Sequence, residues 1–275
     1  MDNKYFNWIF TSVIFILLAW ACNRHPYTET NRNYKKQVKS ISKQLKELPP
    51  VDSVFPAAWP VATVNFNLRK PNYVIIHHTA QNSCQQTLKT FTTKISQVSA
   101  HYVICKDGTL HHMLNDYFRA WHGGLARWGG LTDINSSSIG IEIDNNGFEA
   151  FTEEQITSLL YLLGNLKKNY GIPAANFIGH SDIAPVRKVD PNVNFPWKRL
   201  AEKGYGIWYD DTTNVELPEG FNNLHALRII GYDVRDSSAA IMAFKRRFLA
   251  IDKDSLLAPA DQKILWKLAQ KNIYQ

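Results

Sequence analysis

The chain has 275 residues, of which 45% are hydrophobic and 20% are charged. This composition is that of an ordinary globular protein and excludes a largely disordered chain. The length suggests one sizeable domain and a smaller one. The net charge of +7 and the pI near 9.2 favour an anionic partner, such as nucleic acid, a lipid surface or the acidic peptides of a cell wall.

The first residues predict export. The apolar run from Trp8 to Trp20 has the length of a signal-peptide core and is shorter than a comfortable membrane span. Residues 18–22 (LAWAC) resemble a bacterial lipobox that is cleaved before Cys22, so residues 1–21 would be a lipoprotein signal peptide and Cys22 would carry the lipid. A plain secretory signal or an uncleaved anchor is the alternative. Asn23 after the cysteine favours sorting to the outer membrane, facing the periplasm.

Residues 22–60 form a basic tether. Its cationic residues are Arg32, Lys35, Lys36, Lys39, Lys43 and Lys46. A short amphipathic helix is compatible with the apolar repeat at Val38, Ile41, Leu45 and Leu48. A solvated linker is nevertheless favoured over a specific lipid-binding helix.

Residues 61–211 alternate strand and helix signals. The expected strands are Tyr73–His77, His101–Cys105, a hairpin partner after the Asp107-Gly108 turn, Ile139–Ile143 and Phe177–His180. The expected helices are Gln85–Ile95, one that opens at Thr152 and one that opens at Phe195. This order predicts an α/β fold with helices flanking a mixed sheet.

The helix that opens at Thr152 has the clearest signature. Thr152 and Gln155 have the spacing of a capping box. The stripe expected to be buried is Ile156, Leu159, Leu160, Leu163 and Leu166.

A small all-helical domain is expected at residues 222–275, after a linker at residues 212–221. Its apolar periodicity predicts three short helices. We expect a separate unit whose deletion spares the chemistry of the preceding domain. The alternative is a lid that packs against that domain and stabilises it.

Three residues at the ends of expected strands are candidate metal ligands: His77, His180 and Asp190. Two imidazoles and one carboxylate suit zinc and leave a fourth position open for water, as hydrolytic zinc sites require. His77 and His78 point to opposite faces of a strand, so only one of them can be a ligand. Taken singly, each candidate is more often structural than a ligand, and spacing alone leaves the interpretation suggestive.

Several motifs together resemble one family. VIIHHTA, WHGG, SSSIGIEI, FIGHSDIAP and VRKVDPN, between residues 72 and 208, are similar in order and spacing to the type 2 zinc N-acetylmuramoyl-L-alanine amidases. That family shares its fold with the peptidoglycan recognition proteins. The nearest relatives are expected among the AmiD-type outer-membrane lipoprotein amidases, which carry a helical peptidoglycan-binding domain.

The resemblance implies a role for each matching residue. His77, His180 and Asp190 would hold one zinc ion per chain, and Glu142 would be the general base. Lys188 would stabilise the developing oxyanion.

The substrate groove is expected to include Trp121, His122 and Asn135. The family commonly has Gly after Asp-Pro, where this chain has Asn192. Asn tolerates the left-handed conformation that Gly would adopt there, so we expect the turn to survive.

The predicted activity is hydrolysis of the amide between N-acetylmuramic acid and L-alanine, in peptidoglycan or muropeptides. The alternatives are a non-catalytic peptidoglycan-binding protein and a zinc peptidase acting on the stem peptide. We expect a monomer. We also expect no nucleic-acid partner, since the positive charge concentrates in the tether. Cys84 and Cys105 could form a disulfide or remain buried thiols.

Overall fold

The computed structural model describes residues 26–46 and 63–273. The chain divides into two compact units, Met1–Asn67 and Leu68–Gln275. The predicted signal peptide and Cys22 lie outside the described residues. Among the described residues, no helix combines the length and apolar character needed to cross a membrane.

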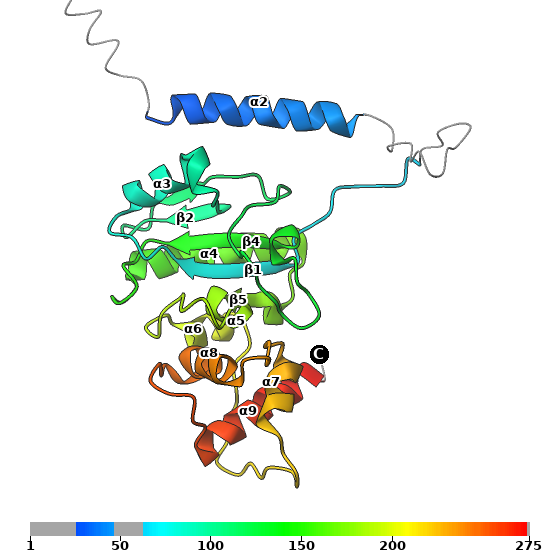
Figure 1. Cartoon of the computed structure of the whole chain (residues 1–275), viewed down its shortest axis with the longest axis vertical. Coiled ribbons are helices and arrows are strands. Elements are labelled where there is room, and N and C mark those ends of the chain that lie inside the picture. Colours follow the sequence, from blue (N-terminus) through cyan, green and yellow to red (C-terminus); the bar gives the residue numbers. More distant parts are fainter. Residues whose placement is uncertain (1–25, 47–62, 274–275) are drawn as a thin grey trace, which may run out of the picture. The chain divides into compact units, whose positions relative to one another are not determined.

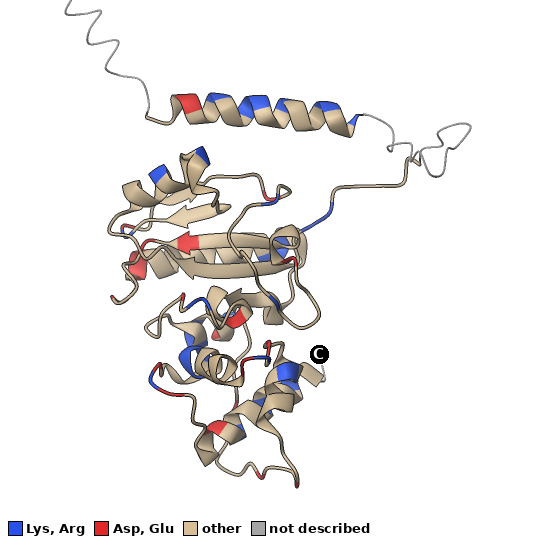
Figure 2. Cartoon of the chain, viewed as in Figure 1, with Lys and Arg blue, Asp and Glu red and all other residues tan. Residues whose placement is uncertain are grey.

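In the first unit, α2 (Thr28–Leu45) is a helix without a buried side chain. It begins well before the apolar repeat that predicted a short helix, and Leu48 of that repeat lies outside the described residues. Lysine and arginine are distributed along its length (Figure 2). Part of the basic tether is therefore helical.

The second unit is built on a five-stranded sheet in the order β3-β2-β4-β1-β5 (Figure 1). The strands are β1 (Tyr73–His78), β2 (Tyr102–Ile104), β3 (Leu110–His112), β4 (Ser138–Ile143) and β5 (Phe177–Gly179). The hairpin of β2 and β3 is antiparallel, whereas β2, β4, β1 and β5 run parallel to their neighbours. The predicted mixed sheet is confirmed.

One face of the sheet is covered by α4 (Glu153–Tyr170). The predicted capping box is present, and Gly171 ends the helix in the left-handed conformation that glycine adopts most readily. Leu162 is buried, whereas Leu160, which was predicted to be buried, is only partly so. The buried face is broader than the predicted stripe, because the helix packs against several strands.

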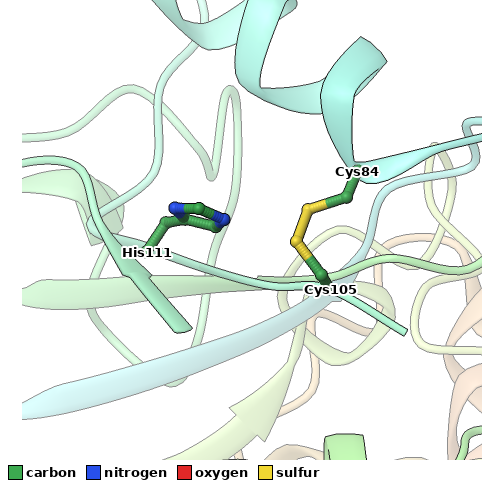
Figure 3. Close-up of side chains that lie close together, drawn as sticks. All are labelled: Cys84, Cys105 and His111. Carbon is green, nitrogen blue, oxygen red and sulfur yellow. A yellow bond between two sulfur atoms is a disulfide. The ribbon is translucent and has the colours of Figure 1, made fainter. Parts of the chain in front are cut away.

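Helix α3 (Cys84–Thr92) is joined to the end of β2 by a disulfide between Cys84 and Cys105, whose Cα atoms are 5.3 Å apart. His111 of β3 lies beside the two sulfur atoms (Figure 3). Sulfur atoms bonded to each other are not thiolates, so we assign no metal to this group. The disulfide resolves the alternative that the sequence left open.

The last helices are α6 (Trp197–Glu202), α7 (Asn223–Ile230), α8 (Ser237–Leu249) and α9 (Pro259–Ile273). The three C-terminal helices share an apolar core that also includes Ile207. Trp128 and Ala175, which precede the predicted linker, pack against the same core. The helical segment is thus continuous with the sheet-containing domain in one compact unit, which favours the packed alternative.

Candidate active site

Three side chains converge at the carboxyl ends of adjacent parallel strands. His77 lies near the end of β1, and His180 opens α5 (His180–Ile183) directly after β5. His77 Nδ1 is 2.8 Å from His180 Nδ1 and 3.2 Å from Asp190 Oδ2, and His180 Nδ1 is 2.9 Å from the same oxygen. The structure therefore brings all three predicted ligands together.

This group fits a metal ion. The three ligand atoms belong to side chains that are nearly buried. Tetrahedral zinc with bonds of about 2.0–2.1 Å separates neighbouring ligand atoms by roughly 3.3 Å, close to the distances observed. Among the described residues, no other His, Cys, Asp or Glu joins this group.

The protonation states also suit a cation. Burial, aided by the nearby His180, lowers the pKa of His77 to about 4, so the imidazole is neutral near pH 7. Burial alone would raise the pKa of Asp190, but the two adjacent imidazoles hold it well below its ordinary range. A neutral imidazole and an ionised carboxylate are the forms that bind metal.

His77 is oriented by a chain of hydrogen bonds that begins at Nε2, the ring nitrogen that does not face the other two ligands. His77 Nε2 is 3.1 Å from His122 Nδ1, and His122 Nε2 is 3.1 Å from Ser138 Oγ. The Ser138 hydroxyl donates to the Ile134 carbonyl at 2.7 Å. If His77 Nδ1 is the ligand, His77 donates to His122 and His122 donates to Ser138, which satisfies every group.

The loop of residues 121–124 (WHGG), which contains His122, also contacts the imidazole of His180. His180 Nε2 lies 3.2 Å from the Gly123 carbonyl and donates to it when Nδ1 faces the metal. Asn135 Oδ1 accepts hydrogen bonds from the backbone N–H groups of His122 and Gly123. A Cβ at Gly140 would lie 2.4 Å from His122 Cγ, so only glycine leaves space for this ring. The WHGG loop thus orients both imidazoles.

Glu142 faces the metal-ligand group from β4. Its register partner is His77, and its Oε1 is 4.0 Å from His77 Nδ1, so the carboxylate lies beside the group rather than within it. Burial, together with the charge of Asp190, raises the pKa of Glu142 to about 8. The positive charge of Lys188 opposes this rise. Glu142 Oε2 is buried without a hydrogen-bond partner in the described structure. Such a carboxylate can accept a proton from a water or substrate group.

The three predicted substrate residues differ in exposure. Trp121 is 53% exposed, whereas His122 and Asn135 are each 8% exposed. The structure engages His122 and Asn135 in contacts that orient ligands and loop, a role the sequence analysis did not predict. Contact with substrate stays a prediction for all three.

The prediction for the turn at Asn192 is wrong in its detail. Asn192 is not among the described non-glycine residues with positive φ, so it needs no left-handed conformation. Its backbone N–H donates to His78 Nδ1 and its side-chain amide donates to Asn145 Oδ1. His78 thus faces away from the metal ligands, as strand alternation predicted.

Sequence reasoning missed Ser138 and Gly140. Both lie on the same face of β4 as Glu142, at spacings of two residues, and this period was the available signal. It also missed Asp182, two of whose partners, Tyr232 and Arg247, are 50 and 65 residues away in the sequence.

Two histidines and an aspartate that could hold a metal ion lie at the strand ends of a mixed sheet, beside a buried glutamate. This arrangement is typical of hydrolases that use a metal ion. The N-acetylmuramoyl-L-alanine amidase family model matches residues 67–193. AmiD of Escherichia coli is 34% identical over 206 residues, which cover 64% of this chain and 74% of AmiD. The chain belongs to the N-acetylmuramoyl-L-alanine amidase family.

Two solved structures are similar to this chain over about three quarters of its length. E. coli AmiD, in complex with the substrate anhydro-N-acetylmuramic acid-L-Ala-D-gamma-Glu-L-Lys, has a TM-score of 0.67 and 28% identity over 76% of this chain and 93% of AmiD. AmpDh3 of Pseudomonas aeruginosa, in complex with an anhydromuramic pentapeptide, has a TM-score of 0.68 and 30% identity. That match covers 77% of this chain and 96% of AmpDh3.

Proposed function

We propose that this chain is a zinc-dependent amidase that hydrolyses the bond between N-acetylmuramic acid and L-alanine in peptidoglycan or muropeptides, for cell-wall turnover. The observation that carries the proposal is the convergence of His77, His180 and Asp190 next to Glu142. A non-catalytic peptidoglycan-binding protein would have no need for this donor set with an adjacent unpartnered carboxylate. The family and its substrate-bound relatives support the choice of substrate.

The two histidines and the aspartate would hold one zinc ion. When bound, zinc would supply Lewis acidity, which favours ionisation of water and polarises a carbonyl. The contacts of His77 Nε2 with His122 and of His180 Nε2 with the Gly123 carbonyl would favour the tautomer in which each Nδ1 is free to hold the ion. The protein thereby fixes the ligands before substrate arrives.

Glu142 would act as general base. Its unpartnered oxygen is free to take a proton from the attacking water, and the same oxygen could return that proton to the departing L-alanine nitrogen. Burial raises the pKa of Glu142 to about 8 in the metal-free site, and the charge of a bound zinc ion would lower that pKa, so that the carboxylate is ionised near pH 7. Lys188, whose ammonium lowers the pKa of Glu142, would stabilise negative charge on the carbonyl oxygen.

We further propose that the mature protein is anchored to the outer membrane by lipid on Cys22 and faces the periplasm. The lipobox-like sequence supports this location. The disulfide also supports it, because disulfides form and persist in oxidising compartments such as the periplasm. Cys22→Ala should release the protein from membranes while it still cleaves soluble substrate. A variant that stays membrane-bound after a carbonate wash would refute the anchor.

The activity can be tested on a soluble anhydro-muropeptide with purified protein. We expect turnover in the zinc-loaded protein, loss with a chelator and recovery when zinc is restored. Full activity of protein shown to contain no metal would contradict the proposal. Binding of muropeptide without turnover, in zinc-loaded protein, would instead favour the non-catalytic alternative.

A further inference from the structure

A buried ionic cluster connects the C-terminal helices to the segment that carries His180. Its centre is Asp182, which is fully buried in α5, two residues after His180. Asp182 Oδ2 accepts hydrogen bonds from the Gly179 N–H at 2.8 Å and from Arg247 Nη1 at 2.5 Å. Asp182 Oδ1 accepts one from the Tyr232 hydroxyl at 2.7 Å. Both carboxylate oxygens are therefore engaged, and two of the three donors come from the helical domain.

Arg247 of α8 makes further contacts with the sheet-containing domain. Its Nη2 donates to the Phe177 carbonyl at 3.0 Å, and its guanidinium lies 4.3 Å from the centre of the Trp197 ring. The Arg247 side chain is only 3% exposed. The guanidinium also lies 5.2 Å from the centre of the Phe248 ring, and its Nε is buried without a hydrogen-bond partner. The hydrogen bonds of Nη1 and Nη2 to Asp182 and Phe177 therefore orient it.

The backbone on both sides of His180 is fixed by this cluster and its surroundings. Gly179 donates its N–H to Asp182, and a Cβ at Gly179 would lie 3.0 Å from the Trp197 side chain and 3.1 Å from Pro191. On the other side, the Ser181 N–H donates to the Asp190 carbonyl at 2.7 Å. The same short segment thus links His180, Asp190 and the cluster.

We propose that Arg247 and Tyr232 are positioning residues for the metal ligand His180. They act through Asp182, so the C-terminal helices complete the metal site. This inference rests on the proposed function, because it treats His180 as a zinc ligand. It also means that removing the helices would take away two of the three donors to Asp182, and would impair metal binding as well as any attachment to the cell wall.

The competing interpretation is that the cluster only stabilises the fold. A matched control exists in the same helix. Arg246 has a side chain that is 4% exposed, and its ion pair with Asp252 stays within α8 and the loop that follows. Arg246 acts on Tyr232 through its charge, but its hydrogen bonds go to Asp252 and not to Asp182. Breaking this ion pair should therefore disturb the helical domain while leaving the hydrogen bonds of Asp182 in place.

The test uses the full-length chain and four variants: Tyr232→Phe, Arg247→Gln, Arg247→Lys and the control Arg246→Gln. Zinc affinity is measured by competition with a chromophoric chelator. The absorption spectrum of the cobalt-substituted protein reports ligand geometry, and thermal melting of the metal-free protein reports stability. Neither metal measurement depends on turnover.

We expect Arg247→Gln to weaken zinc binding about tenfold, the lower end of the range for residues that orient a metal ligand, because Arg247 acts through the backbone. Arg247→Lys should recover part of that loss, since a lysine can still pair with Asp182. Tyr232→Phe removes one hydroxyl and should have a smaller effect in the same direction. The cobalt spectrum should change in the variants of Arg247 and Tyr232 and stay unchanged in Arg246→Gln.

Equal zinc affinity and an unchanged cobalt spectrum in Arg247→Gln, with a fall in melting temperature like that of Arg246→Gln, would overturn the inference. That result leaves the proposed function intact if the wild-type chain binds zinc and is active. A wild-type chain that binds no zinc would instead refute the proposed function itself. The two failures are therefore distinguishable.

Discussion

Replacing His122 by phenylalanine should weaken metal binding, although His122 is not a predicted ligand. Phenylalanine keeps an aromatic ring in the space above Gly140 but removes both ring nitrogens. The buried His77 Nε2 then loses its acceptor, His122 Nδ1. The Ser138 hydroxyl loses the donor His122 Nε2. A buried N–H without a partner costs about 1–3 kcal/mol.

His77 escapes this cost by turning Nε2 away, which moves Nδ1 off the metal position. The expected loss is about 10–100-fold in zinc affinity, the usual effect of removing a partner of a metal-bound histidine. Tenfold corresponds to about 1.4 kcal/mol, so the two magnitudes agree. Ser138→Ala should cost less, because His77 keeps its acceptor.

Zinc affinity would be measured by chelator competition, with His101→Phe as the matched control. His101 is also a fully buried imidazole, but its nitrogens bond to the backbone of Gly140 and Phe118. His101→Phe should lower stability more than zinc affinity. Unchanged zinc affinity in His122→Phe, or equal losses in both variants, would refute the proposed role of the hydrogen-bond chain.

Three further predictions follow from the site and its surroundings. Glu142→Gln should retain zinc and substrate but lose turnover by about 10²-fold or more, and unimpaired turnover would place the base elsewhere. Lys188→Met should lower kcat by about 10²–10³-fold with zinc content unchanged, and a change in KM alone would remove its role in the transition state. Replacing Cys84 and Cys105 together by serine should lower the free energy of unfolding by about 3 kcal/mol, since the disulfide spans 21 residues; unchanged urea denaturation would contradict this.

The strands were predictable because they depend on local periodicity, whereas the metal ligands were predictable because they lie in motifs that resemble a known family. Alternation predicted that only one of His77 and His78 could be a ligand, and in the structure His77 and Glu142 lie on the face opposite the one that carries Ile141 and Ile143. The family motifs then grouped His180 and Asp190 with His77. Each of these predictions used residues within one strand or one short motif.

The contacts of His122 and Asn135 were not predictable in the same way. Both residues lie in loops, where no period fixes the direction of a side chain. Their burial depends on Gly140 in another strand and on the path of the loop between them. The sequence analysis therefore assigned them to the substrate groove on resemblance alone.

The contact between Asp182 and Arg247 lies beyond local sequence patterns. The two residues are 65 positions apart, and both are ionisable residues of types usually found at the surface. The change from alternating strands and helices to short helices predicted two domains. It contained no information on the buried ion pair between them.

The most direct test of the proposed function is to locate the bond that is cut. Hydrolysis of an anhydro-muropeptide in heavy-oxygen water would be followed by mass spectrometry of both products. The proposed function predicts one heavy oxygen in the lactyl carboxylate of the muramic acid and an unlabelled peptide with a free L-alanine amine. Heavy oxygen in a carboxylate of the stem peptide, with L-alanine still attached to muramic acid, would contradict it and identify a peptidase.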